Sequence, residues 1–457
     1  MIPLTLAEIA QVTGGTVHGP ATTVTGPAVI DSREVTPGSL FVAIVGERSD
    51  GHDFAPGAYD AGAVAVLGSR PVDGPCVVVD DVVAALTELA AFVRDGLDPV
   101  VIGLTGSVGK TTTKDLLAQI LENEGPTVAT DRSYNNEIGL PLTILRADRD
   151  TRFLVLEMGA GRPGDITHLA RVARPRLGLV LNVAPAHLRT LGGLAGIAKA
   201  KSELVRALPD LEVGGLALLN ADDKAVAAMA DVTRAGVLFY GHDADIRPSD
   251  VTLDAEGHVS FVLHTPSGEA PVRLRLPGEH QVANALAAAS VATAVGVPAD
   301  RIAAALGSAV PRSLHRFQVI DRPDGVTVID DAYNANPASM RAALHTMSAM
   351  ATGRRTIAVL GEMTGQADET AHHHAAIGKM VGDLNIAILV VVGTGDGPTA
   401  LAAAARRANI FTHALPDRAA ALDLLQGLLR PSDVVLIKAS SEAALTTLAE
   451  SLRVPAK

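Results

Sequence analysis

The sequence predicts an α/β protein built from three domains, and three observations support this prediction. From residue 100 onward, short runs of β-branched residues alternate with amphipathic segments rich in Ala and Leu, which is the pattern of strand-helix units in a parallel sheet. One strand-to-helix junction carries a glycine-rich loop that ends in Lys-Thr. At 457 residues the chain is too long for one ordinary core, so typical domain sizes favour about three domains.

The first hundred residues form a separate unit. They end in a helical pattern over residues 82–93, followed by Gly96-Leu97-Asp98-Pro99, which is typical of a linker. We therefore predict a small N-terminal α/β domain over residues 1–98.

The next unit, residues 99–311, is predicted to be a parallel-sheet domain that contains the glycine-rich loop. Residues 250–276 differ from the rest of it, because alternating residues and turn glycines predict a small β excursion there. The expected strands are residues 100–104, 153–157, 177–182 and 216–220, and the expected helices are residues 112–124, 164–172, 197–207 and 281–295.

The third unit, residues 312–457, begins after Pro311 with a fresh series of strands and helices from residue 319. We predict a Rossmann-like domain here. Its expected strands are residues 326–329, 356–360, 386–392 and 434–438, and its expected helix is residues 337–350.

The loop after the strand 100–104 has the features of a phosphate-binding loop. Gly106 and Gly109 let backbone N–H groups turn toward an anion, Lys110 can reach the β- and γ-phosphates, and the Thr111 hydroxyl can hold Mg²⁺. The usual Walker pattern has glycine where this chain has Leu104, so the fit is to the variant T-G-x-x-G-K-T-T. The expected nucleotide-binding residues are Gly106, Ser107, Val108, Gly109, Lys110, Thr111 and Thr112.

Polar residues follow several predicted strands at the edge where open α/β sheets bind ligands. Glu157 ends one strand and could hold Mg²⁺ beside Lys110 and Thr111, although a helix-capping or salt-bridged role is equally compatible with the pattern. His187 follows another strand, where an isolated histidine is more often a hydrogen-bonded loop residue. Lys201 lies on a predicted helix, and periodicity alone predicts a solvated lysine.

Composition excludes several classes of function. A formal net charge of -12 disfavours a nucleic-acid interface. The single cysteine, Cys76, lies in an apolar run and fits a buried thiol in a reducing compartment. The N-terminus lacks a basic segment and the apolar runs are too short to span a bilayer, so we expect neither export nor membrane insertion, and a cytoplasmic protein.

Together, these motifs resemble the Mur ligase family, and the resemblance extends over essentially the whole chain. The string Y-N-A-N-P-x-S-M at residues 333–340 is the most specific of them. The others are Asp31-Ser32-Arg33, Gly46, residues 50–54, the phosphate loop, residues 135–141, Glu157-Met158-Gly159, His187, residues 200–203, Gly278-Glu279-His280, Asn284 and Arg316.

The resemblance implies an ATP-dependent ligase that adds D-alanyl-D-alanine to a UDP-N-acetylmuramoyl-tripeptide through an acyl phosphate. Family members that add diaminopimelate or lysine resemble Y-A-H-N-P instead, and the D-N-P-R string typical of diaminopimelate addition is not found in this sequence. The implied domains are a UDP-substrate-binding domain, an ATP-binding domain and a C-terminal ligase domain, in a protein that we expect to be a monomer.

The resemblance also implies roles for individual residues. Lys110, Glu157, His187 and Lys201 would be catalytic, with Thr111 and Glu157 holding one Mg²⁺ and His187 and a carbamylated Lys201 organising a second. The remaining nucleotide-binding residues would be Asn284, which contacts adenine, Arg316, Asp331, Asn334 and Asn336; the substrate-binding residues would be Ser32, Arg33, Asn135 and Asn136.

Two departures from the family pattern and two alternative functions are relevant. The usual G-x-H-N appears as Gly278-Glu279-His280-Gln281, and a K-G-S-R-like string appears as Lys438-Ala439-Ser440-Ser441. A sister ligase or a folylpolyglutamate synthase-like enzyme is the nearest alternative. A nucleotide switch is the alternative from another class, but the chain has no N-K-x-D string for reading guanine. The phosphate loop and Asp331 lie in different predicted domains, so we expect domain closure around the nucleotide.

Overall fold

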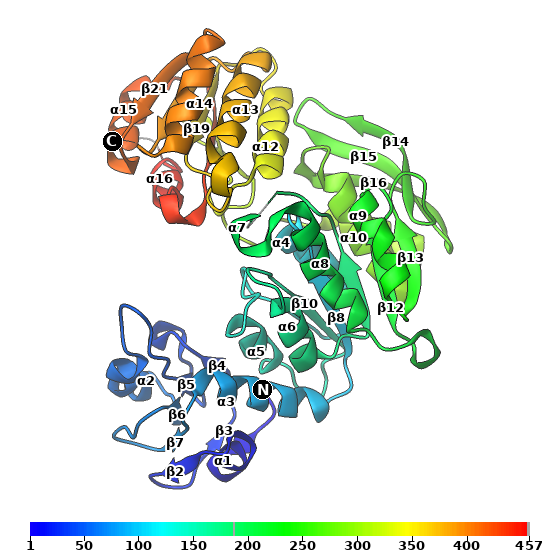
Figure 1. Cartoon of the computed structure of the whole chain (residues 1–457), viewed down its shortest axis with the longest axis vertical. Coiled ribbons are helices and arrows are strands. Elements are labelled where there is room, and N and C mark those ends of the chain that lie inside the picture. The colour runs from blue at the N-terminus through cyan, green and yellow to red at the C-terminus, as the bar shows by residue number, and fades with distance from the viewer. Residues whose placement is uncertain (186–187, 455–457) are drawn as a thin grey trace.

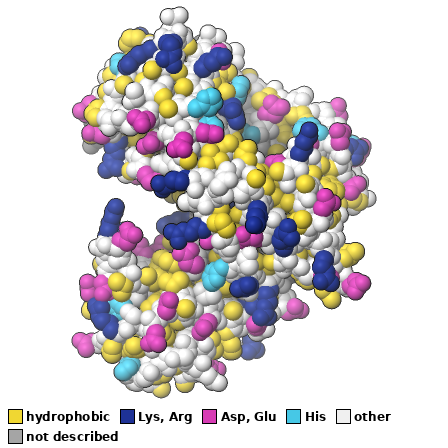
Figure 2. All heavy atoms as spheres, in the orientation of Figure 1, with side chains coloured by type: hydrophobic (Ala, Val, Ile, Leu, Met, Phe, Trp, Pro, Cys, Tyr) yellow, Lys and Arg dark blue, Asp and Glu magenta, His cyan; other side chains and the backbone are white. Residues whose placement is uncertain are grey.

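The computed structural model describes residues 1–185 and 188–454 and has three domains. Figure 1 shows the first domain (blue) and the C-terminal domain (yellow to red) on the same side of the central domain (cyan and green). Figure 2 shows a hollow between the first and the C-terminal domain, bordered by Lys and Arg side chains together with acidic ones. Within the described ranges, no helix combines the length and the apolar character needed to cross a bilayer.

The first domain is a small mixed sheet with helices against it. The strand order is β2-β7-β6-β5-β4, and β2 pairs antiparallel with β7 while the other neighbours are parallel. Cys76 lies buried in β7, as its apolar neighbours predicted. The bounds are α1 Leu6–Thr13, β2 Thr16–His18, β4 Ala28–Val29, β5 Leu40–Val42, α2 Ala55–Asp60, β6 Ala65–Gly68, β7 Cys76–Val78 and α3 Val82–Asp95, with β1 Leu4–Thr5 and β3 Thr23–Val24 paired separately.

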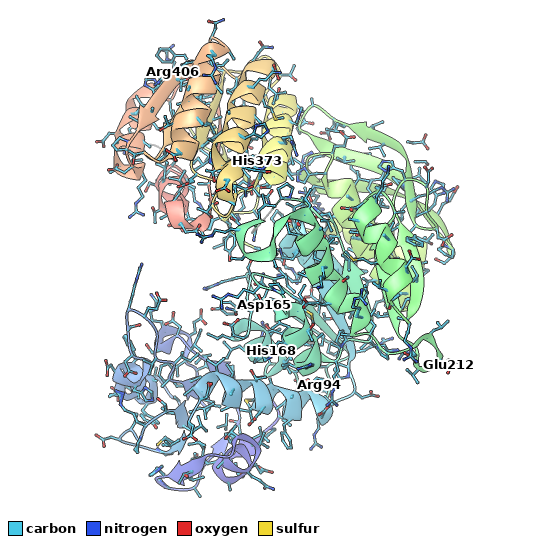
Figure 3. The ribbon with its side chains drawn as sticks, in the orientation of Figure 1. Arg94, Asp165, His168, Glu212, His373 and Arg406 are labelled. Carbon is cyan, nitrogen blue, oxygen red and sulfur yellow. The ribbon has the colours of Figure 1, made fainter. Side chains whose placement is uncertain are left out.

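Helix α3 confirms the helix predicted over residues 82–93 and joins the first domain to the central one. Asp81 caps its first turn by accepting hydrogen bonds from the N–H groups of Val83 and Ala84. Its apolar residues belong to one continuous hydrophobic cluster with residues of α5 and α6 in the central domain. Arg94, near its end, is buried (Figure 3), and its neighbour Asp95 pairs with Arg174 of the central domain at 2.9 Å.

The central sheet is parallel throughout, as predicted, with the order β13-β12-β11-β8-β10-β9. Its strands are β8 Val100–Thr105, β9 Thr127–Ala129, β10 Phe153–Glu157, β11 Leu177–Val180, β12 Leu216–Asn220 and β13 Gly236–Tyr240. Its helices are α4 Lys110–Glu122, α5 Gly139–Ile144, α6 Asp165–Ala173, α7 Leu188–Leu191, α8 Gly193–Arg206, α9 Lys224–Ala227, α10 Gln281–Ala294 and α11 Ala299–Ser308.

Strand β11 ends two residues earlier than predicted. It stops at Val180, because Asn182 turns toward the phosphate loop and its side chain accepts the N–H groups of Ser107 and Val108. The β excursion predicted over residues 250–276 is confirmed. It is an antiparallel sheet of β14 Arg247–Leu253, β15 His258–Thr265 and β16 Gly268–Pro277.

The C-terminal domain has the strand order β17-β18-β22-β19-β20-β21, parallel apart from the antiparallel strand β17. Its strands are β17 Gln318–Asp321, β18 Thr327–Asp330, β19 Thr356–Leu360, β20 Ile388–Val392, β21 Phe411–Leu415 and β22 Val434–Lys438. Its helices are α12 Pro337–Met350, α13 Thr370–Asp383, α14 Asp396–Arg407, α15 Arg418–Leu428 and α16 Thr446–Ser451.

The predicted domain boundaries fall between regular elements. The boundary at residues 98/99 lies between α3 and β8, and that at 311/312 lies between α11 and β17. The carboxyl ends of β8, β10 and β11 meet at one edge of the central sheet, so the loops that follow them converge there.

Candidate active site

The phosphate loop joins β8 to α4, as the sequence predicted. Gly109 has φ +83° and directly precedes α4. A Cβ atom at Gly109 would lie 2.4 Å from Asn284 Oδ1, and one at Gly106 would lie 2.8 Å from the Cβ of Leu181. Glycine is therefore required at both positions, and the first N–H groups of α4 are left without intrahelical acceptors. Such a helix start binds phosphate.

Two of the predicted loop residues already have partners. The N–H groups of Ser107 and Val108 donate to Asn182 Oδ1 at 3.0 and 2.9 Å. The donors that remain for a phosphate are those at the start of α4, up to Thr112. These two N–H groups would bind phosphate only after release of their bonds to Asn182.

Lys110 is held beneath the loop. Its Nζ donates to the carbonyl oxygen of Gly106 at 3.0 Å. The pKa of Lys110 is lowered from its ordinary value, mainly because the side chain is buried. The charge of Arg316 lowers it further, and the Glu157 carboxylate partly offsets both effects. Lys110 and Arg316 therefore repel each other across the site, and an anion placed between them would relieve this repulsion.

Thr111 and Glu157 lie together, as expected for a metal site. The Thr111 hydroxyl donates to Glu157 Oε2 at 3.0 Å, and Asn135 donates from its amide to Glu157 Oε1 at 2.7 Å. Glu157 is 1% exposed. Neither of these bonds is a helix cap, whereas the charge of nearby Lys110 does interact with the Glu157 carboxylate. A buried carboxylate beside the hydroxyl oxygens of Thr111 and Ser133 is the kind of donor set that suits Mg²⁺.

Arg316, from the C-terminal domain, contacts the group formed by Thr111 and Glu157. Its Nη2 donates to the hydroxyl oxygens of Thr111 at 3.2 Å and Ser133 at 3.1 Å. Its guanidinium carbon lies 4.1 Å from the centre of the Tyr333 ring, a cation–π contact. Its buried Nε has no hydrogen-bond partner among the described residues. A buried guanidinium with an unused donor is suited to an incoming phosphate.

Lys201 is buried in α8, with 5% of its surface exposed, so the solvated lysine predicted from periodicity is wrong. The pattern failed because α8 lies against the sheet and the loop at its edge. Burial lowers the pKa of Lys201 well below its ordinary value, and nearby Lys110 lowers it further. In the part of the chain that the structure describes, no carboxylate forms an ion pair with Lys201. His187 lies outside the described residues.

Asn284 lies in α10 and supports the loop from behind. The Thr113 hydroxyl donates to Asn284 Oδ1 at 3.3 Å, and Asn284 donates to Gln281 Oε1 at 2.8 Å. Gln281 in turn contacts His280 at 3.1 Å. The glutamine that departs from the usual family pattern therefore orients Asn284.

Asp331 follows β18 and is strongly paired. Lys438 Nζ donates to Asp331 Oδ2 at 2.6 Å, and the N–H of Phe317 donates to its Oδ1 at 3.1 Å. Asn336 caps α12, and the Asn334 side chain accepts the N–H of Ala335. These residues follow strand β18 of the C-terminal sheet. Their side chains bond to the backbone of the chain near Arg316 and at the start of α12.

In the first domain, the predicted substrate-binding residues Ser32 and Arg33 lie in a short 3₁₀ helix, Ser32–Glu34. Arg33 is exposed and donates to Asp31 at 2.6 Å, which lowers the pKa of Asp31 to about 2. Glu34 pairs with Arg132 of the central domain at 3.3 Å. This 3₁₀ helix therefore lies beside the loop that contains Ser133, across the hollow from the C-terminal domain. Asn136 accepts the N–H groups of Ile138 and Gly139 just before α5.

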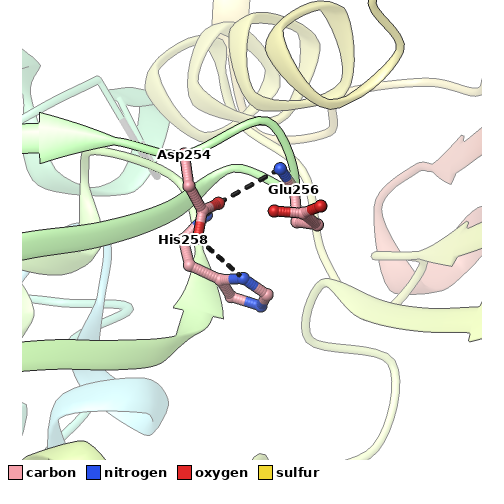
Figure 4. Close-up of side chains that lie close together, drawn as sticks. All are labelled: Asp254, Glu256 and His258. Carbon is pink, nitrogen blue, oxygen red and sulfur yellow. Dashed lines mark hydrogen bonds and ion pairs between the residues drawn. The ribbon is translucent and has the colours of Figure 1, made fainter.

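A separate cluster of possible metal ligands lies outside this site. Asp254, Glu256 and His258 share the turn between β14 and β15 (Figure 4). Asp254 accepts the N–H groups of Glu256 and His258, and it pairs with Arg273 at 2.8 Å. These contacts of Asp254 stabilise the turn.

The C-terminal domain contains a cavity of about 520 Å³ at the carboxyl ends of its parallel strands. Its charged lining residues are Glu362, Asp417, Arg418 and Glu442, of which Asp417 caps α15 by accepting the N–H of Ala420. Thr364 also lines it and donates to Glu442 at 3.1 Å. The next residue, Gly365, accepts the N–H of Leu188 of the central domain, so the cavity wall touches that domain.

Sequence reasoning missed four residues of this region. Ser133 and Tyr333 contact Arg316, Asn182 holds the phosphate loop, and Lys438 neutralises Asp331. Asn182 had a detectable signal, a polar residue at the end of an apolar strand. Lys438 has the same signal, because it ends the apolar strand β22, and Tyr333 begins the Y-N-A-N-P string, although neither pattern showed what the residue contacts. Ser133 lies in a loop, and no spacing rule connects it with Arg316.

Three family models match the chain. They are described as "Mur ligase family, catalytic domain" over residues 28–97, "Mur ligase middle domain" over residues 104–292, and "Mur ligase, glutamate ligase domain" over residues 315–441. The matches follow one another along the three domains of the structure.

Curated relatives and solved structures match over nearly the whole chain. The chain is 44% identical to a UDP-N-acetylmuramoyl-tripeptide--D-alanyl-D-alanine ligase of Mycobacterium tuberculosis, covering 99% of this chain and 98% of that one. It is 35% identical to the Escherichia coli ligase of the same name, with 99% of each covered. A crystal structure of MurF from Acinetobacter baumannii superposes with a TM-score of 0.85 at 32% identity, covering 99% of each chain. MurF ligase from Thermotoga maritima in complex with ADP superposes with a TM-score of 0.77 at 28% identity, covering 94% of this chain and 97% of that one.

Proposed function

The chain belongs to the Mur ligase family, and we infer that it joins D-alanyl-D-alanine to UDP-N-acetylmuramoyl-tripeptide in an ATP-dependent reaction of peptidoglycan synthesis. The observation that carries this inference is the similarity to ligases of that name over 98–99% of both chains. The arrangement of Lys110, Thr111 and Glu157 at one sheet edge supports it.

The reaction needs an activated carboxyl group, because oxide is a very poor leaving group. Transfer of the γ-phosphoryl group of ATP to an oxygen of the tripeptide carboxylate gives an acyl phosphate and ADP. The amine of the dipeptide then attacks the acyl carbon and loses a proton, and inorganic phosphate leaves from the tetrahedral intermediate. The first step brings two anions together, so catalysis depends on positioning and on positive charge.

We propose that Lys110 and Arg316 supply this charge from the protein. Lys110 lies at the phosphate loop, and Arg316 carries a buried donor with no partner among the described residues. Both side chains already lie at the site, although Arg316 must exchange its contacts with Thr111 and Ser133 for contacts with phosphate oxygens. In this proposal Lys110 contacts the β- and γ-phosphates and Arg316 the transferred phosphoryl group.

We further propose that Thr111 and Glu157 hold one Mg²⁺. Their oxygens fit a hard cation, and Ser133 and Asn135 surround them. A bound Mg²⁺ would supply additional positive charge at the phosphates. Arg316 now donates to the Thr111 oxygen, so it would release that oxygen and turn its donors to the nucleotide.

The second predicted ion rests on Lys201 and His187. Burial lowers the pKa of Lys201 and so favours the neutral amine, which is the form that reacts with CO₂ to give a carbamate and a proton. The product is an anion, and the cation Lys110 nearby would then stabilise it. We propose this modification of Lys201, with His187 as its partner at the second Mg²⁺.

Contacts with the other substrates stay predictions. Asn284 would reach adenine, Asp331, Asn334 and Asn336 would border the nucleotide, and Ser32 and Arg33 would hold the UDP-sugar. Asn135 and Asn136 would lie near the tripeptide. The exposed Arg33 is available to a diphosphate, and its 3₁₀ helix lies beside the loop of Ser133, which is consistent with a substrate that extends between the domains.

The cavity of the C-terminal domain fits the acceptor dipeptide. At neutral pH D-alanyl-D-alanine carries an ammonium group, a carboxylate and two small methyl groups. Glu362 and Glu442 can attract the ammonium group, and Arg418 the carboxylate. The K-G-S-R pattern has an arginine where this chain has Ser441, which is uncharged and donates to Glu442 at 3.2 Å. In this chain we therefore assign the binding of the dipeptide carboxylate to Arg418.

A product-mass assay with isotope tracing tests the proposed function. The protein is incubated with ATP, Mg²⁺, UDP-N-acetylmuramoyl-tripeptide labelled with ¹⁸O in its terminal carboxylate, and D-alanyl-D-alanine. We expect a pentapeptide product and ¹⁸O in the released phosphate. Phosphate without label would contradict the acyl phosphate.

The same assay separates the alternatives. Product from a single amino acid would indicate a sister ligase, and product from a folate and glutamate would indicate a folylpolyglutamate synthase-like enzyme. Nucleotide binding without any product would indicate a nucleotide switch.

We also propose that the enzyme acts as a monomer in the cytoplasm, where ATP and UDP-linked precursors are available. Sedimentation at working concentration and fractionation of cells test these two proposals.

A further inference from the structure

Arg316 is held by an unusual backbone segment. The residues on either side of it, His315 and Phe317, have φ values of +58° and +51°. Bulky side chains rarely adopt this left-handed conformation, and such strain persists only when surrounding contacts impose it. The contacts that impose it here therefore decide where the Arg316 guanidinium points.

His315 is anchored on its inner side by a buried carboxylate. His315 Nδ1 lies 2.8 Å from Asp330 Oδ2, and Asp330 is fully buried at the end of β18. The His315 N–H donates to Gln318 Oε1 at 3.3 Å, and its carbonyl accepts the N–H of Tyr333 at 3.2 Å. Tyr333 also lies against the guanidinium of Arg316, so the same residue contacts both the strained backbone and the side chain that it presents.

Arg453 forms hydrogen bonds with Asp330 and Gln318, the two residues whose side chains hold His315. Its Nη2 donates to Asp330 Oδ2 at 3.2 Å and to Gln318 Oε1 at 3.2 Å. Arg453 follows α16 and lies 137 positions after Arg316 in the sequence. Among the described residues, its side chain bonds to Asp330 and Gln318 and its backbone N–H to the carbonyl of Glu450, and none of these belongs to the phosphate loop or to the proposed metal site.

We propose that Arg453, acting through Asp330 and His315, is a positioning residue that sets the Arg316 guanidinium against the phosphoryl group being transferred. This inference rests on the proposed function of Arg316. Without Arg453, the buried Asp330 carboxylate loses one of its hydrogen bonds and is held less firmly. The segment 315–317 can then relax toward more common backbone angles. The guanidinium would then move relative to Thr111 and Ser133, while the phosphate loop itself stays unchanged.

A double-mutant cycle on the full-length enzyme tests the proposal, using Arg453→Ala, Arg316→Ala and the double variant. We expect Arg453→Ala to lower kcat about tenfold, less than the roughly hundredfold loss that a 1 Å misplacement can cause. The KM values for ATP and the UDP-tripeptide should change less than about twofold. In the Arg316→Ala background, Arg453→Ala should have no further effect on kcat, and Arg453→Lys should recover part of the loss in the wild-type background.

The outcomes distinguish this inference from the proposed function. If Arg316→Ala leaves kcat intact, the proposed role of Arg316 fails. If Arg316→Ala is impaired but Arg453→Ala is not, or if the two losses multiply, only the positioning role fails. Arg406 is the matched control, because it lies at the end of α14, away from the hollow (Figure 3), and Arg406→Ala should retain full kcat. If Arg453→Ala does not fold, His315→Asn replaces it, since asparagine tolerates the left-handed conformation.

Discussion

The central domain meets its two neighbours through interfaces of different chemistry. Toward the first domain the contact is mainly a hydrophobic core, with two ion pairs beside it. Leu86, Leu89 and Val93 of α3 belong to the same buried cluster as Leu140 of α5 and Leu169 of α6. Toward the C-terminal domain the hydrophobic clusters are separate, and across the described residues no cluster contains members of both domains.

The second interface consists of polar and aromatic contacts at the reacting groups. Arg316 donates to Thr111 and Ser133, and the rings of His280 and Phe317 lie edge to face with centroids 6.3 Å apart. Ser313 donates its N–H to Asp115 at 3.1 Å. Such contacts can be exchanged for contacts with a ligand at little net cost, whereas opening a shared apolar core exposes surface to water. We therefore expect the first two domains to move as one unit and closure to occur at the C-terminal domain.

The largest expected effect comes from removing the central cation of the polar interface. Lys110→Ala should lower the rate of product formation by at least about a hundredfold to a thousandfold, the usual loss for a preorganised electrostatic group. Phosphate release and product mass measure it. Lys199→Ala, on the exposed side of α8, is the matched control and should be fully active. Full activity of Lys110→Ala would remove our catalytic assignment.

A somewhat smaller effect is expected for the proposed metal ligand. Glu157→Gln preserves shape but removes the negative charge, so the rate at moderate Mg²⁺ should fall about a hundredfold and the Mg²⁺ concentration for half-maximal rate should rise. Titration with Mg²⁺ at saturating ATP measures both. Glu88→Gln on α3 serves as the control, since Glu88 is exposed. An unchanged Mg²⁺ requirement would refute this ligand.

The apolar interface should respond in stability and not in catalysis. Leu89→Ala creates a cavity in the shared core and should cost about 2–5 kcal/mol of folding free energy. The folded fraction should keep kcat within about threefold of wild type, the order of change expected for a site whose own contacts are intact. Thermal unfolding measures the loss. Leu314→Ala, at an exposed leucine near Arg316, should leave stability unchanged. Separate unfolding transitions for the first and central domains would contradict their shared core.

Closure at one interface predicts a local pattern of hydrogen exchange. Adding ATP analogue, Mg²⁺ and UDP-tripeptide should protect residues 131–136 and 313–317, where the central and C-terminal domains meet. Helix α3 and its partners should exchange as before. Small-angle scattering should show compaction under the same conditions. Protection confined to α3 would place the moving joint at the other interface.

The smallest effect is expected from pH. The pKa of His280 is lowered to about 4, mainly because the ring is buried. The Asp331 carboxylate partly offsets this effect, and the Lys438 ammonium adds to it. In the unfolded chain the pKa is near 6.5, so between pH 6.5 and 4 the unfolded state binds more protons. His280 should therefore make stability fall as the pH drops through this window, and His280→Asn should reduce the slope. An identical slope in the variant would contradict this assignment.

The sequence predicted the features that depend on local patterns. The alternation of apolar strands and helices predicted the parallel central sheet, and the glycines before Lys110 predicted a loop that only glycine can form. Glu157 could be placed beside Thr111 because parallel strands end at one edge of a sheet. The residues that hold these groups were not predictable. Ser133 meets Arg316 across 183 positions, and Lys201 is buried although its helical spacing is typical of a solvent-exposed lysine.

The shared core around α3 has a consequence for inhibitor design. A small molecule that spans the hollow would meet one wall of fixed shape, formed by the first two domains, and one adjustable wall on the C-terminal side. A rigid scaffold matched to the fixed wall would lose little entropy on binding, whereas a rotatable linker is best placed toward the adjustable wall. Compounds optimised against the open form should therefore keep their pose on the first wall after closure and change it only on the second.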